Sequence, residues 1–97
     1  MSRQDIINAT LERLRSVCKM KGIAERKPFG EATVLIGPDA VLDSLGIVLL
    51  LVQVEESLSA SSGHPVSFVQ RLFTNDLASE TVGSLSEQIF QMVESQS

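Results

Sequence analysis

Apolar residues recur at helical spacing through the first twenty positions of the chain. The stripe is formed by Ile7, Leu11, Leu14 and Cys18, and it is widened by Ile6 and Val17. Ser2, with Asp5 three residues later, resembles a capping box, in which each side chain binds the other residue's backbone N–H. The pattern predicts a helix from Arg3 to about Lys19.

The next twenty positions lose this periodicity and are broken repeatedly by glycine and proline. The breaks fall at Gly22, Pro28, Gly30, Gly37 and Pro38, and they predict a long ordered loop over residues 22–42. Within this loop, "TVLI" is expected to be extended because a proline follows closely. The stretch "GPDA" has the form of a turn with proline at its second position.

The sequence "LGIVLLLV" is a nearly continuous apolar run, which suits a buried strand as well as a buried helix. Its length favours the helix, because apolar positions continue while Glu55 and Glu56 open a polar face that we expect to be solvated. We predict a helix over residues 45–58 with Asp43 as its N-cap. The sequence "SASSGHP", residues 59–65, then reads as a linker.

In the last third of the chain, apolar and polar residues first follow no clear period and then follow a regular helical one. Residues 66–73 predict no single element, and a one-turn helix is expected over residues 76–78, capped by Thr74 or Asn75. Thr81 is a suitable cap for a last helix. The apolar positions of that helix follow the 3.6-residue period: Val82, Leu85, Ile89, Met92 and Val93.

These elements predict an all-α fold, a small antiparallel bundle of three longer helices plus one short helix, in a single domain over residues 1–97. A chain of 97 residues with 43% hydrophobic composition builds one compact core but not two. Since there is no Trp or Tyr, the core must consist of Leu, Ile and Val. Four phenylalanines supplement it: Phe29, Phe68, Phe73 and Phe90.

The single cysteine and the lengths of the apolar stretches restrict where the protein can be located. Cys18 is the only cysteine, and the start of the chain lacks the apolar core of a signal peptide, so we expect a cytoplasmic protein. The longest apolar stretch, residues 47–52, is far shorter than the roughly 20 residues of a membrane span. We therefore expect no span.

The net charge of −4 is divided unevenly along the chain. Residues 1–27 carry seven Lys/Arg against three Asp/Glu, whereas residues 28–97 carry one against nine. The overall acidity argues against nucleic acid as a partner. The basic first third is interpreted as the solvated face of a helix, and a patch for an acidic surface is the alternative.

The sequence contains few of the residues that common catalytic sites require, and we expect that the protein is not an enzyme. Ser44 is not part of a GxSxG elbow, and a serine hydrolase needs a histidine base with an acid to orient it. The only histidine, His64, lies between Gly63 and Pro65, where a solvated loop histidine is the ordinary case. Cys18 and His64 fall short of the about four ligands of a zinc site. Glycine-rich phosphate loops are absent.

What remains is Ser44, in the predicted first turn of the second long helix. A phosphate attached there would be stabilised by free backbone N–H groups and by the helix dipole. An ordinary first-turn serine is the alternative, and the residue types alone leave both open.

The tripeptide "DSL" in this position resembles the acyl carrier protein family, which includes peptidyl and aminoacyl carriers. The sequence "VLDSLGIVLLLVQVEE" is similar to the attachment helix of these carriers, and "NDLASETVGSLSEQIFQMV" is similar to their third and fourth helices. The resemblance implies that a phosphopantetheinyl transferase joins the 4′-phosphopantetheine of coenzyme A to Ser44 as a phosphodiester. The arm would carry an acyl or aminoacyl group as a thioester for loading and cargo-processing enzymes.

The resemblance also implies roles for the neighbours of Ser44. Asp43 would orient the serine and the metal-bound substrate of the transferase, and Leu45 would dock into partner enzymes. Val48 and Val52, one and two turns further, would lie on the face that carriers present to partners or fold around cargo. Such a carrier is expected to be a monomer.

Two departures from the fatty-acid carriers indicate different partners. Gly46 and Leu49 stand where those carriers usually have acidic residues, and "DSLG" is closer to the D-alanyl type and other stand-alone carriers. If Leu49 is exposed, docking depends on apolar contact and only weakly on salt. The loop before Ser44 and the segment 59–73 are also longer than in compact carriers. We therefore expect a dedicated partner set in a specialised biosynthetic pathway.

Two other classes of function stay open. A helical protein-interaction module without the modification would use the apolar second helix as a docking surface. A small hydrolase with Ser44 as nucleophile is the third possibility, and it would be labelled by a fluorophosphonate probe. We expect no such labelling.

Overall fold

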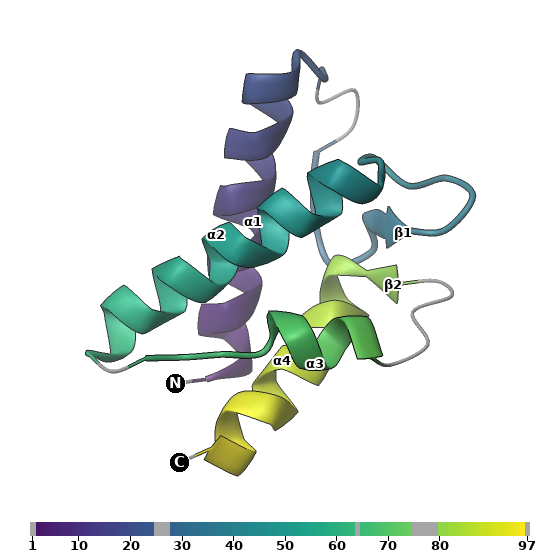
Figure 1. The fold of residues 1–97 in the computed structure, drawn as a ribbon. Helices are drawn as coiled ribbons and strands as arrows, with labels where there is room; N and C mark the ends of the chain where they lie inside the picture. The colour runs from purple at the N-terminus through teal and green to yellow at the C-terminus, as the bar shows by residue number, and fades with distance from the viewer. Residues whose placement is uncertain (1, 25–27, 64, 75–79, 97) are drawn as a thin grey trace.

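The computed structural model describes residues 2–24, 28–63, 65–74 and 80–96. Within these residues the chain is mostly helical with two short strands. The helices are α1 (Arg3–Lys21), α2 (Ser44–Ser62), α3 (Val69–Thr74) and α4 (Val82–Gln96), and the strands are β1 (Val34–Ile36) and β2 (Glu80–Thr81) (Figure 1). The short helix predicted over residues 76–78 lies outside the described residues.

The first helix forms as its apolar stripe predicts. The Asp5 N–H donates to Ser2 Oγ at 3.1 Å, and the Ser2 N–H donates to Asp5 Oδ2 at 2.9 Å. The predicted capping box is therefore confirmed. The helix continues to Lys21, and it ends there because Gly22 takes the left-handed φ of 72° that closes the last turn.

The last helix begins where Thr81 is expected to cap it. The Ser84 N–H donates to Thr81 Oγ1 at 3.2 Å, and the Thr81 N–H donates to Ser84 Oγ at 2.8 Å. This reciprocal pair satisfies backbone donors that the first turn of a helix leaves free. The side chains of Val82, Leu85, Ile89 and Val93 are buried, as the 3.6-residue period predicts.

The second long helix is longer than its apolar run indicates. Asp43 caps it as predicted, but α2 continues through Ser62, so the prediction of a linker from Ser59 is wrong. Ser59 Oγ donates to Glu55 O at 2.8 Å, a bond back to the preceding turn that a serine inside a helix can make. The helix stops at Gly63, which adopts a φ of 75°.

After Gly63 the chain returns along α2, and two side chains of α2 hold it there. Ser59 Oγ accepts the Val66 N–H at 2.8 Å. One turn earlier, Glu55 Oε2 accepts the N–H groups of Phe68 and Val69 at 2.9 and 3.1 Å. The sequence predicts that Glu55 lies on a solvated face. In the fold its carboxylate caps α3, so it is not simply solvated. The segment 59–73, for which the sequence predicts a linker and then no single element, contains the last turn of α2 and most of α3.

Glu55→Ala should destabilise the fold far more than Glu56→Ala. Removal of the Glu55 carboxylate leaves two backbone donors at the start of α3 without their acceptor, and the loss of such a cap costs about 1–2 kcal/mol. Glu56, the exposed neighbour, is the matched control. Urea denaturation measures both free energies of unfolding. Equal values for the two variants would contradict the capping role of Glu55.

The loop between α1 and α2 is fixed to the start of α4. The predicted extended segment is β1, which pairs antiparallel with β2, and the predicted turn is closed by the Ala40 N–H, which donates to Gly37 O at 3.2 Å. The N–H groups of Val82 and Gly83 donate to the carbonyls of Thr33 and Glu31, each at 2.9 Å. Loop carbonyls therefore satisfy the first donors of α4.

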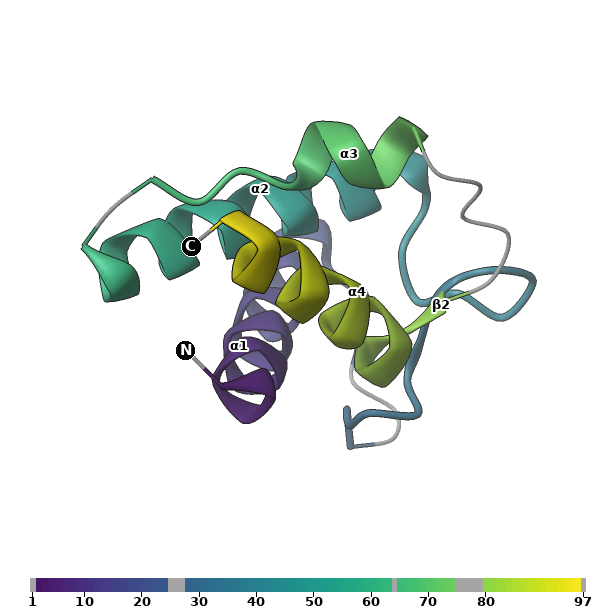
Figure 2. The same cartoon turned by 90° about the horizontal axis from the view of Figure 1, so that it is seen from below.

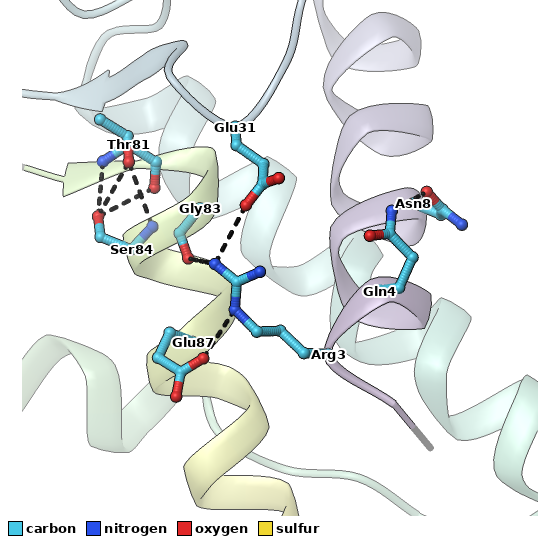
Figure 3. A network of polar contacts seen from close by, with 8 residues as sticks. All are labelled: Arg3, Gln4, Asn8, Glu31, Thr81, Gly83, Ser84 and Glu87. Carbon is cyan, nitrogen blue, oxygen red and sulfur yellow. Dashed lines mark hydrogen bonds and ion pairs between the residues drawn. The ribbon is translucent and has the colours of Figure 1, made fainter.

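Arg3 connects three segments of the chain at this place (Figure 3). Its Nε donates to Glu87 Oε2 of α4 at 2.7 Å, and its Nη2 lies 3.1 Å from Glu31 Oε1 of the loop. Gly83 is buried under the loop, and a Cβ at this position would lie 3.2 Å from the Glu31 Cβ. A side chain at position 83 would therefore push Glu31 away by a few tenths of an ångström, so the close approach of loop and helix favours a glycine here.

The core lies where the helices meet. α1 packs against both α2 and α4, and α3 lies against α2 (Figure 2). Phe68 and aliphatic side chains from all four helices are fully buried in this core: Leu14, Val17, Leu50, Val54, Leu72, Leu85 and Ile89. Cys18 is buried as well, and Phe29 and Phe90 pack against the core from its edge.

One helix of the described chain, α2, is long and apolar enough to cross a membrane by length and composition alone. A core helix of a soluble protein meets the same test. In this fold the buried positions of α2 contact the rest of the core, among them Ile47, Leu51 and Leu58.

Candidate functional site

Ser44 is the first residue of α2 and is exposed to solvent. The preceding residue, Asp43, has an extended backbone with φ −79° and ψ −180°, so the chain turns from loop to helix between the two residues. The Ile47 N–H donates to Asp43 O at 2.9 Å as a first bond of the helix. No group of the described chain binds the Ser44 hydroxyl. The hydroxyl is therefore accessible to a group from outside.

The Asp43 carboxylate is held by two donors. The Gly46 N–H donates to Asp43 Oδ1 at 2.7 Å, and Lys21 Nζ lies 3.5 Å from the same oxygen. The Gly46 N–H lowers the pKa of the Asp43 carboxyl, and the Lys21 cation lowers it further, against a partial desolvation that raises it. The carboxylate is thus kept ionised beside Ser44.

Lys21 is the residue of this site that the sequence does not reveal. It is the last residue of α1, and its ion pair with Asp43 joins the end of α1 to the start of α2. Only its place in the last, basic turn of a helix could be read from the sequence, and that place has an ordinary explanation in the helix dipole.

Asp43→Asn should lower the stability near neutral pH, and the difference from the wild type should disappear in acid. Because folding lowers the pKa of Asp43, its carboxylate contributes stability above the unfolded value of 3.8, and this contribution is lost as the pH falls through the folded pKa. Asparagine is also a good N-cap, so the comparison isolates the charge. Urea denaturation at a series of pH values measures the difference. A difference of constant size down to acid would contradict this expectation.

Gly46 is buried, whereas the other residues predicted to form the docking surface are exposed. A Cβ at position 46 would lie 3.0 Å from the Leu42 Cβ and 3.1 Å from Asp43 Oδ1. The prediction that Gly46 belongs to the docking surface is therefore wrong. The glycine lets the first turn of α2 pack closely against the end of the loop.

The other predicted docking residues form one exposed apolar stripe on α2. Leu45 is 72% exposed, and Val48, Leu49 and Val52 are 36 to 40% exposed. Their spacing of three and four places them on one face of the helix, directly after Ser44. Among the described residues, Met20 is the other large apolar side chain with such exposure. Large apolar side chains in a contiguous exposed patch mark an interaction site more often than scattered ones do.

The described residues also form hollows near this region. An open groove of about 520 Å³ runs between α2 and the start of α3, and it is lined by Val48, Val52, Glu55, Ser67, Val69 and Gln70. The end of the apolar stripe thus forms one wall of this groove. A second hollow of about 800 Å³ lies within the loop after α1, where Ile23, Phe29 and Val41 contribute to its lining.

The described residues offer no group of three or more His, Cys, Asp or Glu side chains that could hold a metal ion. His64 lies outside the described residues. Cys18 is buried in the core between the helices, away from solvent. The start of α2 thus brings together an exposed hydroxyl, a carboxylate and the Lys21 ammonium group.

The arrangement combines an accessible serine, a fixed carboxylate and an apolar stripe at one end of one helix. In comparisons with known proteins, no family model, no curated protein and no solved structure matches this chain.

Proposed function

We propose that this protein is a carrier that holds an acyl or aminoacyl group as a thioester on a 4′-phosphopantetheine arm attached to Ser44. One observation carries the proposal: the serine of the "DSL" sequence is exposed at the first position of α2, with Asp43 before it and the apolar stripe directly after it. This is the arrangement that the resemblance to the acyl carrier family implies for an attachment site.

The proposal includes the finer description of the fold. In it the long helices α1, α2 and α4, with the short α3 packed on α2, are an acyl-carrier-like antiparallel bundle. The packing of α1 on both α2 and α4 supports this description. The two short strands are an addition that ties the longer loop to α4.

The attachment requires little chemistry from the carrier itself. Ser44 Oγ attacks the phosphorus of coenzyme A that bears the pantetheine, the Oγ–P bond forms, and 3′,5′-adenosine bisphosphate leaves. The hydroxyl proton passes to the transferase or to solvent. The carrier supplies an accessible hydroxyl and a nearby carboxylate, and a new phosphodiester at this position lies at the positive end of the α2 dipole. The protein is thus a substrate of other enzymes and not an enzyme.

The apolar stripe is the proposed contact surface for the transferase and for the loading and cargo-processing enzymes. Because Leu49 is exposed where fatty-acid carriers usually have an acidic residue, docking would depend on apolar contact rather than on charge. We place the carrier in the cytoplasm as a monomer, without a membrane span and without a nucleic-acid partner. Its pathway is a specialised one, and efficient complementation of a fatty-acid carrier defect would argue against that.

The experiment that tests the function is the measurement of one mass. The chain is co-expressed with a promiscuous phosphopantetheinyl transferase, and the purified protein is expected to gain the mass of one phosphopantetheine on the peptide that contains Ser44. No gain with several transferases would rule out the carrier function. In cells that contain the native pathway, the mass of the attached ester would identify the cargo.

A protein-interaction module without the modification is the second candidate, and the exposure of the stripe is the observation that favours it. In that case Ser44→Ala would leave partner binding intact, whereas a charge at Val52 would abolish it. A carrier also gains phosphopantetheine on Ser44, which the interaction module does not. The mass of the wild-type chain, measured together with partner binding of the two variants, therefore separates the candidates.

A further inference from the structure

The end of α1 reaches the attachment site through one side chain. Lys21 is the last residue of α1, and its Nζ lies 3.5 Å from Asp43 Oδ1. The lysine side chain is only 28% exposed, whereas that of Asp43 is 66% exposed. The Lys21 side chain is thus more covered than the carboxylate it meets, which reduces the freedom that the ammonium group loses in the pair. Lys19, in the same helical turn, is exposed and has no such contact within the described chain.

The pair fixes the orientation of the Asp43 carboxylate. Both the Gly46 N–H and the Lys21 ammonium bind Oδ1. They approach this oxygen from two different elements, the first turn of α2 and the end of α1. With Oδ1 occupied in this way, Oδ2 is left for a group from outside the chain, such as the metal ion of a bound enzyme. The geometry of the carboxylate is therefore set before any partner arrives.

Stability alone does not explain this contact. An ion pair at the surface adds little to stability, because solvent screens it and its side chains lose conformational freedom. The value of a carboxylate in an enzyme complex depends more strongly on its position, since small displacements of positioned groups lower rates considerably.

We propose that Lys21 is a positioning residue for the modification of Ser44, which acts by holding the Asp43 carboxylate in the orientation that the transferase requires. The inference rests on the proposed carrier function. Lys21 itself touches neither the coenzyme nor the reacting hydroxyl, and its whole effect passes through Asp43.

The test compares rates of modification of the purified, unmodified protein by a promiscuous transferase with coenzyme A. Lys21→Met keeps the length of the side chain and removes the charge. It should lower kcat/KM by roughly threefold to tenfold, as coupling between contacting charged residues does. The loss should fall mainly on kcat, because the apolar docking stripe is unchanged. Lys21→Arg should restore most of the rate, and Lys19→Met, the matched control in the same turn, should retain the wild-type rate.

The double variant decides whether the effect passes through Asp43. In the Asp43→Asn background, which is itself slow, Lys21→Met should have no further effect on the rate. NMR titration gives a readout that needs no transferase: Lys21→Met should raise the pKa of Asp43 toward its ordinary value, and Lys19→Met should not.

The possible failures are distinct. If the wild-type chain is not modified by any transferase, the carrier function fails, and this role of Lys21 fails with it. If the wild type is modified, a wild-type or higher rate for Lys21→Met would overturn the role of Lys21 alone. So would a loss that persists in the Asp43→Asn background.

Discussion

Ser44→Ala should abolish attachment of phosphopantetheine completely while the protein stays folded. The attachment needs the serine oxygen as the nucleophile, and alanine has no atom that can replace it. The fold should tolerate the change because the Ser44 side chain is exposed and its hydroxyl binds no group of the described chain. We therefore expect an unfolding free energy within about 0.5 kcal/mol of the wild type, as for ordinary surface substitutions.

Intact mass after co-expression with the transferase measures the attachment of phosphopantetheine, and urea denaturation measures the free energy of unfolding. Ser61→Ala, at an exposed serine near the other end of the same helix, is the matched control and should gain the full mass. A mass gain in Ser44→Ala would place the attachment at another residue. Loss of the gain in both variants would point to a general defect of α2.

Leu50→Ala and Leu49→Ala, two changes of the same kind at adjacent positions, should differ sharply in their effect on stability. Leu50 is fully buried in the core, whereas Leu49 is 37% exposed on the apolar stripe. Truncation of a buried leucine removes its transfer free energy and leaves a cavity, at a cost of about 2–5 kcal/mol. For Leu49 we expect a cost below about 2 kcal/mol, because more than a third of the residue already contacts water and truncation leaves no enclosed cavity.

Chemical denaturation of the two variants measures this difference in stability. The modification assay measures how fast each variant receives phosphopantetheine. Leu49→Ala should fold normally but be modified more slowly, since it shortens the proposed docking surface. Similar losses of stability at both positions would mean that the stripe is covered in the folded protein, and the docking proposal would then be wrong.

Local sequence signals predicted the three long helices and their starts correctly, but they did not predict α3. Ser2, Asp43 and Thr81 each cap the helix that follows them, because a cap depends on residues only two or three positions away. The buried stripe of α1 and the buried positions of α4 also follow the helical period closely. The exposure of Leu45, Val48, Leu49 and Val52 agrees with their assignment to one face.

Most of the errors come from contacts that reach beyond the next helical turn. The serine-rich sequence after Leu58 looks like a linker because serine is a weak helix former. In the fold, however, Ser59 and Glu55 bind the returning segment at Val66 and Phe68. No local pattern contains this information, and the same is true of β2, whose partner strand lies more than forty residues earlier.

The candidate site, too, has a part that the local sequence predicts and a part that it does not. Ser44, Asp43 and the apolar stripe follow from one stretch of sequence. The partner of Asp43 does not, because Lys21 lies at the end of the preceding helix and reaches the site only when α1 and α2 pack together. Gly46 was misread although its contact is local: a Cβ at this position would meet the Leu42 side chain, four positions earlier.

The bonds that fix the loop to α4 also bear on the order of folding. Arg3 binds Glu87, 84 positions later, and the first donors of α4 find their acceptors at residues 31 and 33. During synthesis, one face of α1 therefore stays without its partner until α4 has been made. Contacts over such distances slow folding relative to helical proteins with mainly local contacts. The nascent chain would expose apolar surface throughout that interval, which raises its tendency to aggregate before α4 is complete.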